Sequence, residues 1–207
     1  MAKNKGLGTL AIIGIVAAVI LVIIILWVIG AYNGLVQADV NVDNAWAQVE
    51  TSYQRRADLI PNLVATVQEA VEFEQETQTK IAELRTQVAS VKNEIQNAKT
   101  PDEMDSAGEK LNGIVENYRG LNINVENYPQ LKATTNFLAL QDELAGTENR
   151  ISVERKRYND AVGVINKKVR FFPTNIIASM FGFEKKEFFE AVEGAETSPE
   201  VGELFEE

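Results

Sequence analysis

The feature that most restricts the fold of this chain is a long uncharged stretch near its start. It reads LGTLAIIGIVAAVILVIIILWVIGA, from Leu7 to Ala31, and no charged residue lies between Lys5 and Asp39. A helix of this length would be roughly 37 Å long, enough to cross a hydrocarbon core of about 30 Å. A secretory signal has an apolar region of only about 7–15 residues. The stretch therefore predicts an uncleaved transmembrane anchor.

Basic residues flank this anchor on one side. Lys3 and Lys5 precede it, whereas the first basic residue after it is Arg55. Positively charged residues favour the cytoplasmic side of a membrane. We therefore expect residues 1–6 to be a short cytoplasmic N-terminus and residues 7–31 to cross the cell membrane once. The helical domain would then lie on the extracytoplasmic side.

The composition argues against most kinds of catalytic and binding chemistry. The 207 residues include no cysteine and no histidine, which excludes disulfides, thiolate nucleophiles and the commonest zinc ligand and general base. Neither a phosphate-binding glycine motif nor a calcium-binding loop motif is present. The formal net charge of -10 opposes nucleic-acid binding. We expect no enzymatic activity, no cofactor, no metal and no nucleic-acid partner.

A seven-residue repeat follows the anchor. Its first set is Val42, Val49, Arg56, Leu63, Ala70, Thr77, Leu84, Val91 and Ala98; its second is Trp46, Tyr53, Ile60, Val67, Glu74, Ile81, Val88 and Ile95. Spacings of three and four residues place both sets on one helical face, as in a coiled coil. Pro61 should kink this helix because proline lacks the backbone N–H.

Two further helices and a short one are expected. Thr100-Pro101-Asp102-Glu103 is typical of a helix start, with Thr100 as the N-cap and Glu103 completing a capping box. This helix should run from Pro101 to about Glu126, before a turn at residues 127–129. A third helix carries Phe137, Leu144, Ile151, Tyr158, Ile165 and Phe172 at intervals of seven. Pro173 should end it, and Thr174 should cap a short helix through Met180.

The expected fold class is all-α: a transmembrane helix followed by a long, antiparallel, up-and-down bundle of three or four helices. The bundle would occupy residues 32–192, and residues 193–207 would form an acidic flexible tail. Residues 42–98 have two alternatives. The unbroken heptad favours one rod, whereas compactness favours a hairpin that folds back near residues 72–77, and we prefer the hairpin.

Charged residues near the middle of two helices suggest a polar layer between them. The members are Arg55, Arg56 and Asp58 on the first helix and Glu148, Arg150 and Glu154 on the third. Arg56 interrupts its heptad and therefore needs a partner, for which Glu148 and Glu154 are the candidates. A buried pair of this kind adds little stability but can fix helix register.

Phenylalanines concentrate near the end of the domain. The cluster is Phe171, Phe172, Phe181, Phe183, Phe188 and Phe189, with the basic residues Lys167, Lys168 and Arg170 before it. Such a cluster can cap the bundle core, or it can dock on the bilayer or on another subunit. In a four-helix arrangement it would return to the membrane side, where basic residues favour anionic lipid.

Several motifs resemble those of the LemA family. They are YNGLV at 32–36, RRADLIPNLV at 55–64, YPQLKATTNFLALQDEL at 128–144, TENRI at 147–151, RYNDAV at 157–162, FPTNIIA at 172–178 and GF at 182–183. The resemblance spans nearly the whole chain and implies a one-span membrane protein with a helical-bundle domain. It implies no activity and no catalytic residues.

Two non-catalytic functions fit these features. One is a scaffold that self-assembles on the lipid bilayer as a homo-oligomer, through seam residues left over after the bundle has packed. The other is an adaptor or sensor that presents its bundle to an envelope protein, such as a membrane protease or a signalling protein. An enzyme would need a catalytic constellation that the sequence does not show.

Overall fold

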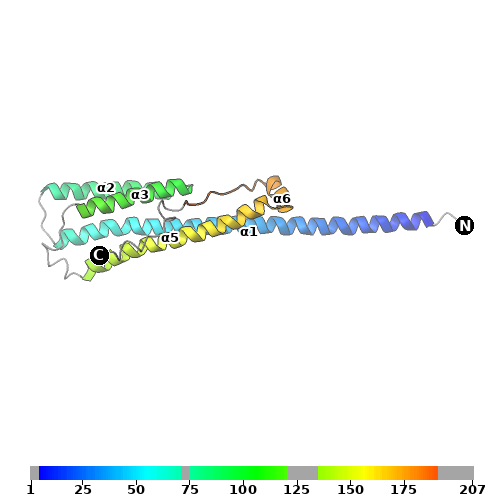
Figure 1. Cartoon of the computed structure of the whole chain (residues 1–207), viewed down its shortest axis with the longest axis horizontal. Helices are drawn as coiled ribbons and strands as arrows, with labels where there is room; N and C mark the ends of the chain where they lie inside the picture. The colour runs from blue at the N-terminus through cyan, green and yellow to red at the C-terminus, as the bar shows by residue number, and fades with distance from the viewer. Residues whose placement is uncertain (1–4, 71–74, 121–134, 191–207) are drawn as a thin grey trace, which may run out of the picture. The chain divides into compact units, whose positions relative to one another are not determined.

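The computed structural model describes residues 5–70, 75–120 and 135–190, and these are helical almost throughout. The helices are α1 (Lys5–Ala70), α2 (Gln75–Asn97), α3 (Pro101–Gly120), α5 (Thr135–Arg170) and α6 (Thr174–Phe181) (Figure 1). No strand occurs in these three ranges, which confirms the all-α prediction. The predicted turn at residues 127–129 and the predicted acidic tail at 193–207 lie outside the described residues.

Helix α1 contains the uncharged stretch and continues beyond it. It is 66 residues long and ends neither at Ala31 nor at Pro61. Its most apolar window has a mean hydropathy of 3.5, and none of that window is buried. Among the described helices, α1 alone is long and apolar enough to cross a membrane, by length and composition.

The heptad region is divided between two helices. Helix α1 ends at Ala70 and α2 begins at Gln75. Lys92 Nζ on α2 lies 2.6 Å from Asp58 Oδ1 on α1, although one straight helix would separate these residues by roughly 50 Å. Asp58 precedes the connection between α1 and α2, and Lys92 follows it by a similar number of residues. Helix α2 therefore runs antiparallel to α1. The hairpin alternative is therefore correct for residues 42–98, and the rod is wrong.

The described residues form two compact units, the first of which contains residues 5–47 and 157–186. Its core comprises buried Leu35, Ile177 and Ala178, with Val28, Ala31, Val169 and Phe183 packed against them. Trp46 contacts Tyr158, with ring centroids 5.5 Å apart, and Lys168 Nζ lies beside Gly34. Moving back along α1 thus corresponds to moving forward along α5, so these helices are antiparallel, as predicted.

The second unit contains residues 48–156 and 187–190 of the described chain. Here α2 and α3 pack along each other (Figure 1). The predicted seam is buried: Val49, Tyr53, Ile60 and Leu63 on α1, Ile81, Leu84, Val88, Val91 and Ile95 on α2, and Leu144 and Ile151 on α5. Burying each large aliphatic side chain contributes about 1.5–3 kcal/mol, so this seam is the main source of the unit's stability.

The helix ends follow the predicted chemistry with two corrections. Thr100 Oγ1 accepts from the Glu103 N–H at 3.3 Å, whereas the Glu103 carboxylate accepts from the Lys99 N–H, not from that of Thr100. Thr174 is not a cap, because it is the first residue of α6 and Pro173 occupies the N-cap position. Gly182 ends α6 with a φ of 75°, a left-handed conformation that glycine adopts without strain.

Candidate functional site

Four of the six residues of the predicted polar layer lie at the surface of the protein. Arg55, Asp58, Glu148 and Arg150 are all exposed. Within the second unit, Arg55 forms an ion pair with Glu143, and Asp58 forms one with Lys92. Exposed pairs of this kind contribute about 0–1 kcal/mol, so these residues do not specify the helix register.

Arg56 and Glu154 are the two members of the predicted layer that are buried, each with 9% of its surface exposed. The Nε atom of Arg56 is buried without a hydrogen-bond acceptor among the described residues. The pairing of Arg56 with Glu148 or Glu154 stays a prediction. Burial of Arg56 agrees with its place in the heptad.

A different polar cluster joins α1, α3 and α5 in the second unit. Arg155 donates from its guanidinium to Asp105 Oδ2 at 2.8 Å, and the Tyr53 hydroxyl donates to Asp105 Oδ1 at 3.4 Å. Tyr53 is almost fully buried, and the Arg155 and Asp105 side chains are 19% and 29% exposed. One carboxylate therefore links an arginine and a tyrosine from two other helices.

The cluster also contacts residues 189 and 190, which follow α6 in the chain. The Arg155 guanidinium lies 4.8 Å from the centre of the Phe189 ring and donates to the Glu190 carbonyl at 3.1 Å. Phe189 is buried, with 3% of its surface exposed. Arg155 thus combines an ion pair, a cation–π contact and a backbone hydrogen bond, and the several N–H donors of one planar guanidinium allow it to make all three at once.

Helix α3 approaches α1 closely at this cluster because Gly108 has no side chain. A Cβ atom at Gly108 would lie 2.7 Å from Cε1 of the Tyr53 ring. Real Cβ atoms are not found so close to a ring carbon, so any larger residue would displace Tyr53. Gly108 is therefore required for the geometry of the cluster.

Burial changes the ionisation of two cluster members. Desolvation raises the pKa of Tyr53 to about 12, and the Asp105 carboxylate adds to the rise, although Arg155 opposes it. Desolvation also raises the pKa of Asp105, because it outweighs the attraction of Arg155 and the hydrogen bond from Tyr53. The Tyr53 phenol is consequently neutral in the folded protein throughout the physiological range.

Alkaline titration should show the raised pKa of Tyr53. The folded value of about 12 lies above the ordinary value of 10.0, so the folded state holds the phenolic proton more tightly than the unfolded state. This contribution to stability is complete below pH 10 and is lost as the pH rises through about 12. We expect one tyrosine to ionise last in absorbance at 295 nm and to be missing in Tyr53→Phe. If the late ionisation persisted in Tyr53→Phe, it would belong to another tyrosine, and its assignment to Tyr53 would be contradicted.

The six phenylalanines are divided between the two units. Phe171, Phe172 and Phe181 are exposed in the first unit, where Phe183 packs against the Leu35 core. In the second unit Phe188 is exposed and Phe189 is buried beneath Arg155. The packing of Phe183 and the burial of Phe189 agree with a role in capping the core, and docking on the bilayer or on another subunit stays a prediction. The basic residues Lys167, Lys168 and Arg170 occupy the last turn of α5.

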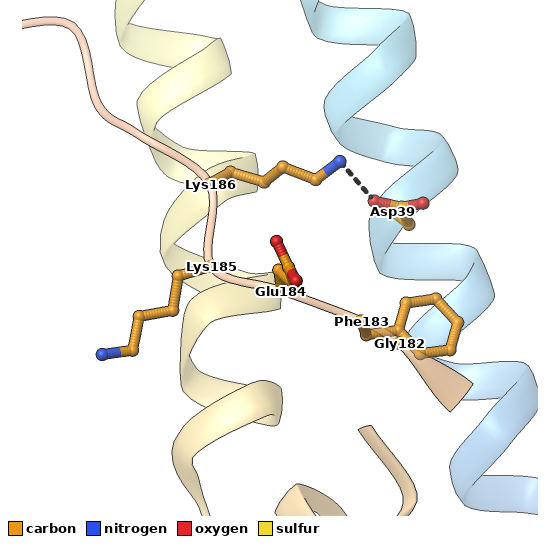
Figure 2. Close-up of a pocket in the computed structure, with 6 residues that line it drawn as sticks. All are labelled: Asp39, Gly182, Phe183, Glu184, Lys185 and Lys186. Carbon is orange, nitrogen blue, oxygen red and sulfur yellow. Dashed lines mark ion pairs between the residues drawn. The ribbon is translucent and has the colours of Figure 1, made fainter. Parts of the chain in front are cut away.

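A shallow pocket lies beside the segment that follows α6 in the first unit. Figure 2 shows its lining residues, Asp39, Gly182, Phe183, Glu184, Lys185 and Lys186, with the Lys186 amine 3.1 Å from the Asp39 carboxylate. The Asn166 side chain forms two hydrogen bonds of 2.9 Å with the backbone of Lys186. These contacts fasten the segment to α1 and α5, which is a structural role.

Sequence reasoning missed Asp105, Gly108 and the contacts of Arg155. A glycine within the apolar face of α3, between buried Met104 and Leu111, is the one local signal of a close helix approach. No group of three or more acidic side chains that could hold a metal occurs in the described ranges.

These features define a class of protein: an all-α helical bundle whose first helix is long and apolar enough to cross a membrane. The chain belongs to the LemA family, whose model matches residues 45–202. It is similar to Protein LemA of Metamycoplasma hominis, with 25% identity over 176 residues, which are 85% of this chain and 76% of that protein. Magnetosome proteins MamQ 1 and MamQ 2 of Paramagnetospirillum magneticum are 29% identical over 83 residues, 40% of this chain and 30% of theirs.

Proposed function

We propose that this protein is a non-catalytic scaffold that is anchored by α1 in the cell membrane and self-assembles through its helical domain. The anchor is supported by the packing at the end of the uncharged stretch. Val28 and Ala31 contact the core formed by Leu35 and Ile177. A cleavable signal would take these residues out of the folded domain, so the packing favours a permanent anchor. The bias of Lys3 and Lys5 supports a cytoplasmic N-terminus.

Self-assembly is supported by one observation on α5. Leu138 and Val153, both in the second unit, are large aliphatic residues whose exposed fractions are 47% and 49%. At 3.6 residues per turn their directions differ by about 60°, so both lie on one side of α5, which we call the strip. Such a strip, left over after the bundle has packed, is suited to a second copy of the same chain.

Photo-crosslinking in intact cells tests this proposal. A photoreactive residue in place of Val153 in the full-length chain should give an adduct of twice the chain's mass. Glu148 is a matched control, because it is exposed on α5 and points away from the strip. Its replacement should give no such adduct. Adducts of Val153 with foreign proteins alone would favour the adaptor function, and the absence of any adduct would overturn self-assembly through the strip.

A further inference from the structure

Helix α6 lies at the point where the uncharged stretch of α1 ends. Its buried residues Ile177 and Ala178 contact Leu35, and the same core includes Val28 and Ala31. The Phe181 ring is 4.7 Å from the Tyr32 ring, measured between centroids. Figure 1 shows α6 folded against α1. The short helix is thus fixed to residues 28–35 of α1.

Helix α6 also carries large apolar side chains that remain exposed. Together with the two residues before Pro173, it exposes Phe171 at 66%, Phe172 at 80%, Ile176 at 49%, Met180 at 72% and Phe181 at 53%. These five exposed apolar side chains within eleven residues, here called the apolar surface of α6, are a concentration of a kind that typically marks an interaction site. Isolated exposed apolar residues would need no such explanation.

The position of this surface along α1 indicates what covers it. About 20 helical residues cross a hydrocarbon core, so the 25-residue stretch is only slightly longer than one crossing and its end at Ala31 lies near the membrane interface. Trp27 and Tyr32 are aromatic residues of the kind that lie at this depth. Because α6 packs at residues 28–35, its apolar surface lies at the same interface, where amphipathic helices insert by about 5–10 Å.

We propose that α6, with Phe171 and Phe172, is a second membrane contact that inserts into the outer part of the bilayer crossed by α1. The occupant of the surface is lipid, because the surface adjoins the lipid-facing end of α1. The neighbouring basic residues Lys167, Lys168 and Arg170 favour anionic headgroups. This inference rests on the anchor of the proposed function but not on self-assembly. Two contacts with one bilayer would restrict the tilt of the domain.

Depth measurements on the full-length chain in vesicles test this second contact. Since the chain has no cysteine, a single cysteine at each chosen position can carry one environment-sensitive fluorophore. We compare Met180→Cys with Val40→Cys, which is similarly apolar and 45% exposed but lies roughly 14 Å beyond Ala31 on α1. Ile20→Cys, in the middle of the stretch, reports insertion of the anchor itself.

The vesicles contain phosphatidylcholine and phosphatidylglycerol with a small fraction of lipid that carries a quencher at a shallow acyl position. We expect lipid quenching at Met180 to exceed that at Val40 by at least about twofold, and quenching to fall when phosphatidylglycerol is omitted. Equal quenching at Met180 and Val40, with Ile20 still quenched, would overturn the second contact while the anchor stands. A Met180 fluorophore that is shielded from water but not quenched by lipid would also overturn it, because protein would then cover α6.

Discussion

Replacing Asp105 with alanine should destabilise the folded protein by about 2 kcal/mol, which corresponds to a fall in Tm of roughly 4–8 °C. The variant leaves the Arg155 guanidinium without the carboxylate 2.8 Å away and leaves the buried Tyr53 hydroxyl without its acceptor. Removing one partner of a buried pair strands the other charge, and this cost exceeds the net contribution of the pair. Thermal unfolding of the full-length protein in detergent, followed by circular dichroism, measures the effect.

An exposed ion pair provides the matched control. Lys110 on α3 pairs with Glu94 on α2 at 2.6 Å, and their side chains are 51% and 40% exposed. Lys110→Ala should change stability by less than about 0.5 kcal/mol. The double variant Asp105→Ala, Arg155→Met should recover part of the loss, because no charge is left unpaired. Equal destabilisation by Asp105→Ala and Lys110→Ala would show that the Tyr53–Asp105–Arg155 cluster does not join the helices.

Two glycine-to-alanine replacements in the same helix should have opposite effects. Gly108→Ala should destabilise the protein by about 1–3 kcal/mol, because its new methyl group would lie 2.7 Å from the Tyr53 ring. Gly113→Ala should stabilise it by about 0.5–1 kcal/mol, because no atom lies within 4 Å and alanine is the better helix former. Chemical unfolding of both variants at fixed detergent concentration checks the two signs.

The pair separates a contact effect from a helix-propensity effect. Both glycines lie in α3, so the gain in propensity is similar for each. Combining Gly108→Ala with Tyr53→Ala should make the glycine replacement favourable, since the ring that it would strike has been removed. Destabilisation by Gly108→Ala that persists without the Tyr53 ring would contradict the close approach of α3 to α1.

Heptad spacing predicted much of the buried face of the helices. Val49, Leu63, Leu84 and Val91 share one phase of the repeat and all lie in the core. The spacing did not locate the end of α1, because Leu63 and Leu84 are 21 residues apart, which is three whole heptads. The phase is therefore the same for a rod and for a hairpin. The choice between them depended on compactness, which is a property of the bundle as a whole.

The heptad predicted for the third helix also continued beyond the end of α5. Phe172 is seven residues after buried Ile165, yet it is 80% exposed because α5 ends at Arg170. Residues 183–190 are not helical, so no helical period could identify Phe189 as a buried residue. Asp105, Arg155 and Phe189 are far apart in the chain and meet only after the helices have packed. Their cluster was beyond prediction from spacing within any one segment.

Self-assembly of a membrane-anchored bundle is tested most directly by the mass of the full-length protein extracted in mild detergent. Light scattering that separates the protein mass from the detergent should give a defined multiple of the chain mass. Val153→Glu, which places a charge on the exposed strip of α5, should reduce this mass to that of one chain while leaving the helical content unchanged. A wild-type protein with the mass of a single chain would contradict the scaffold function.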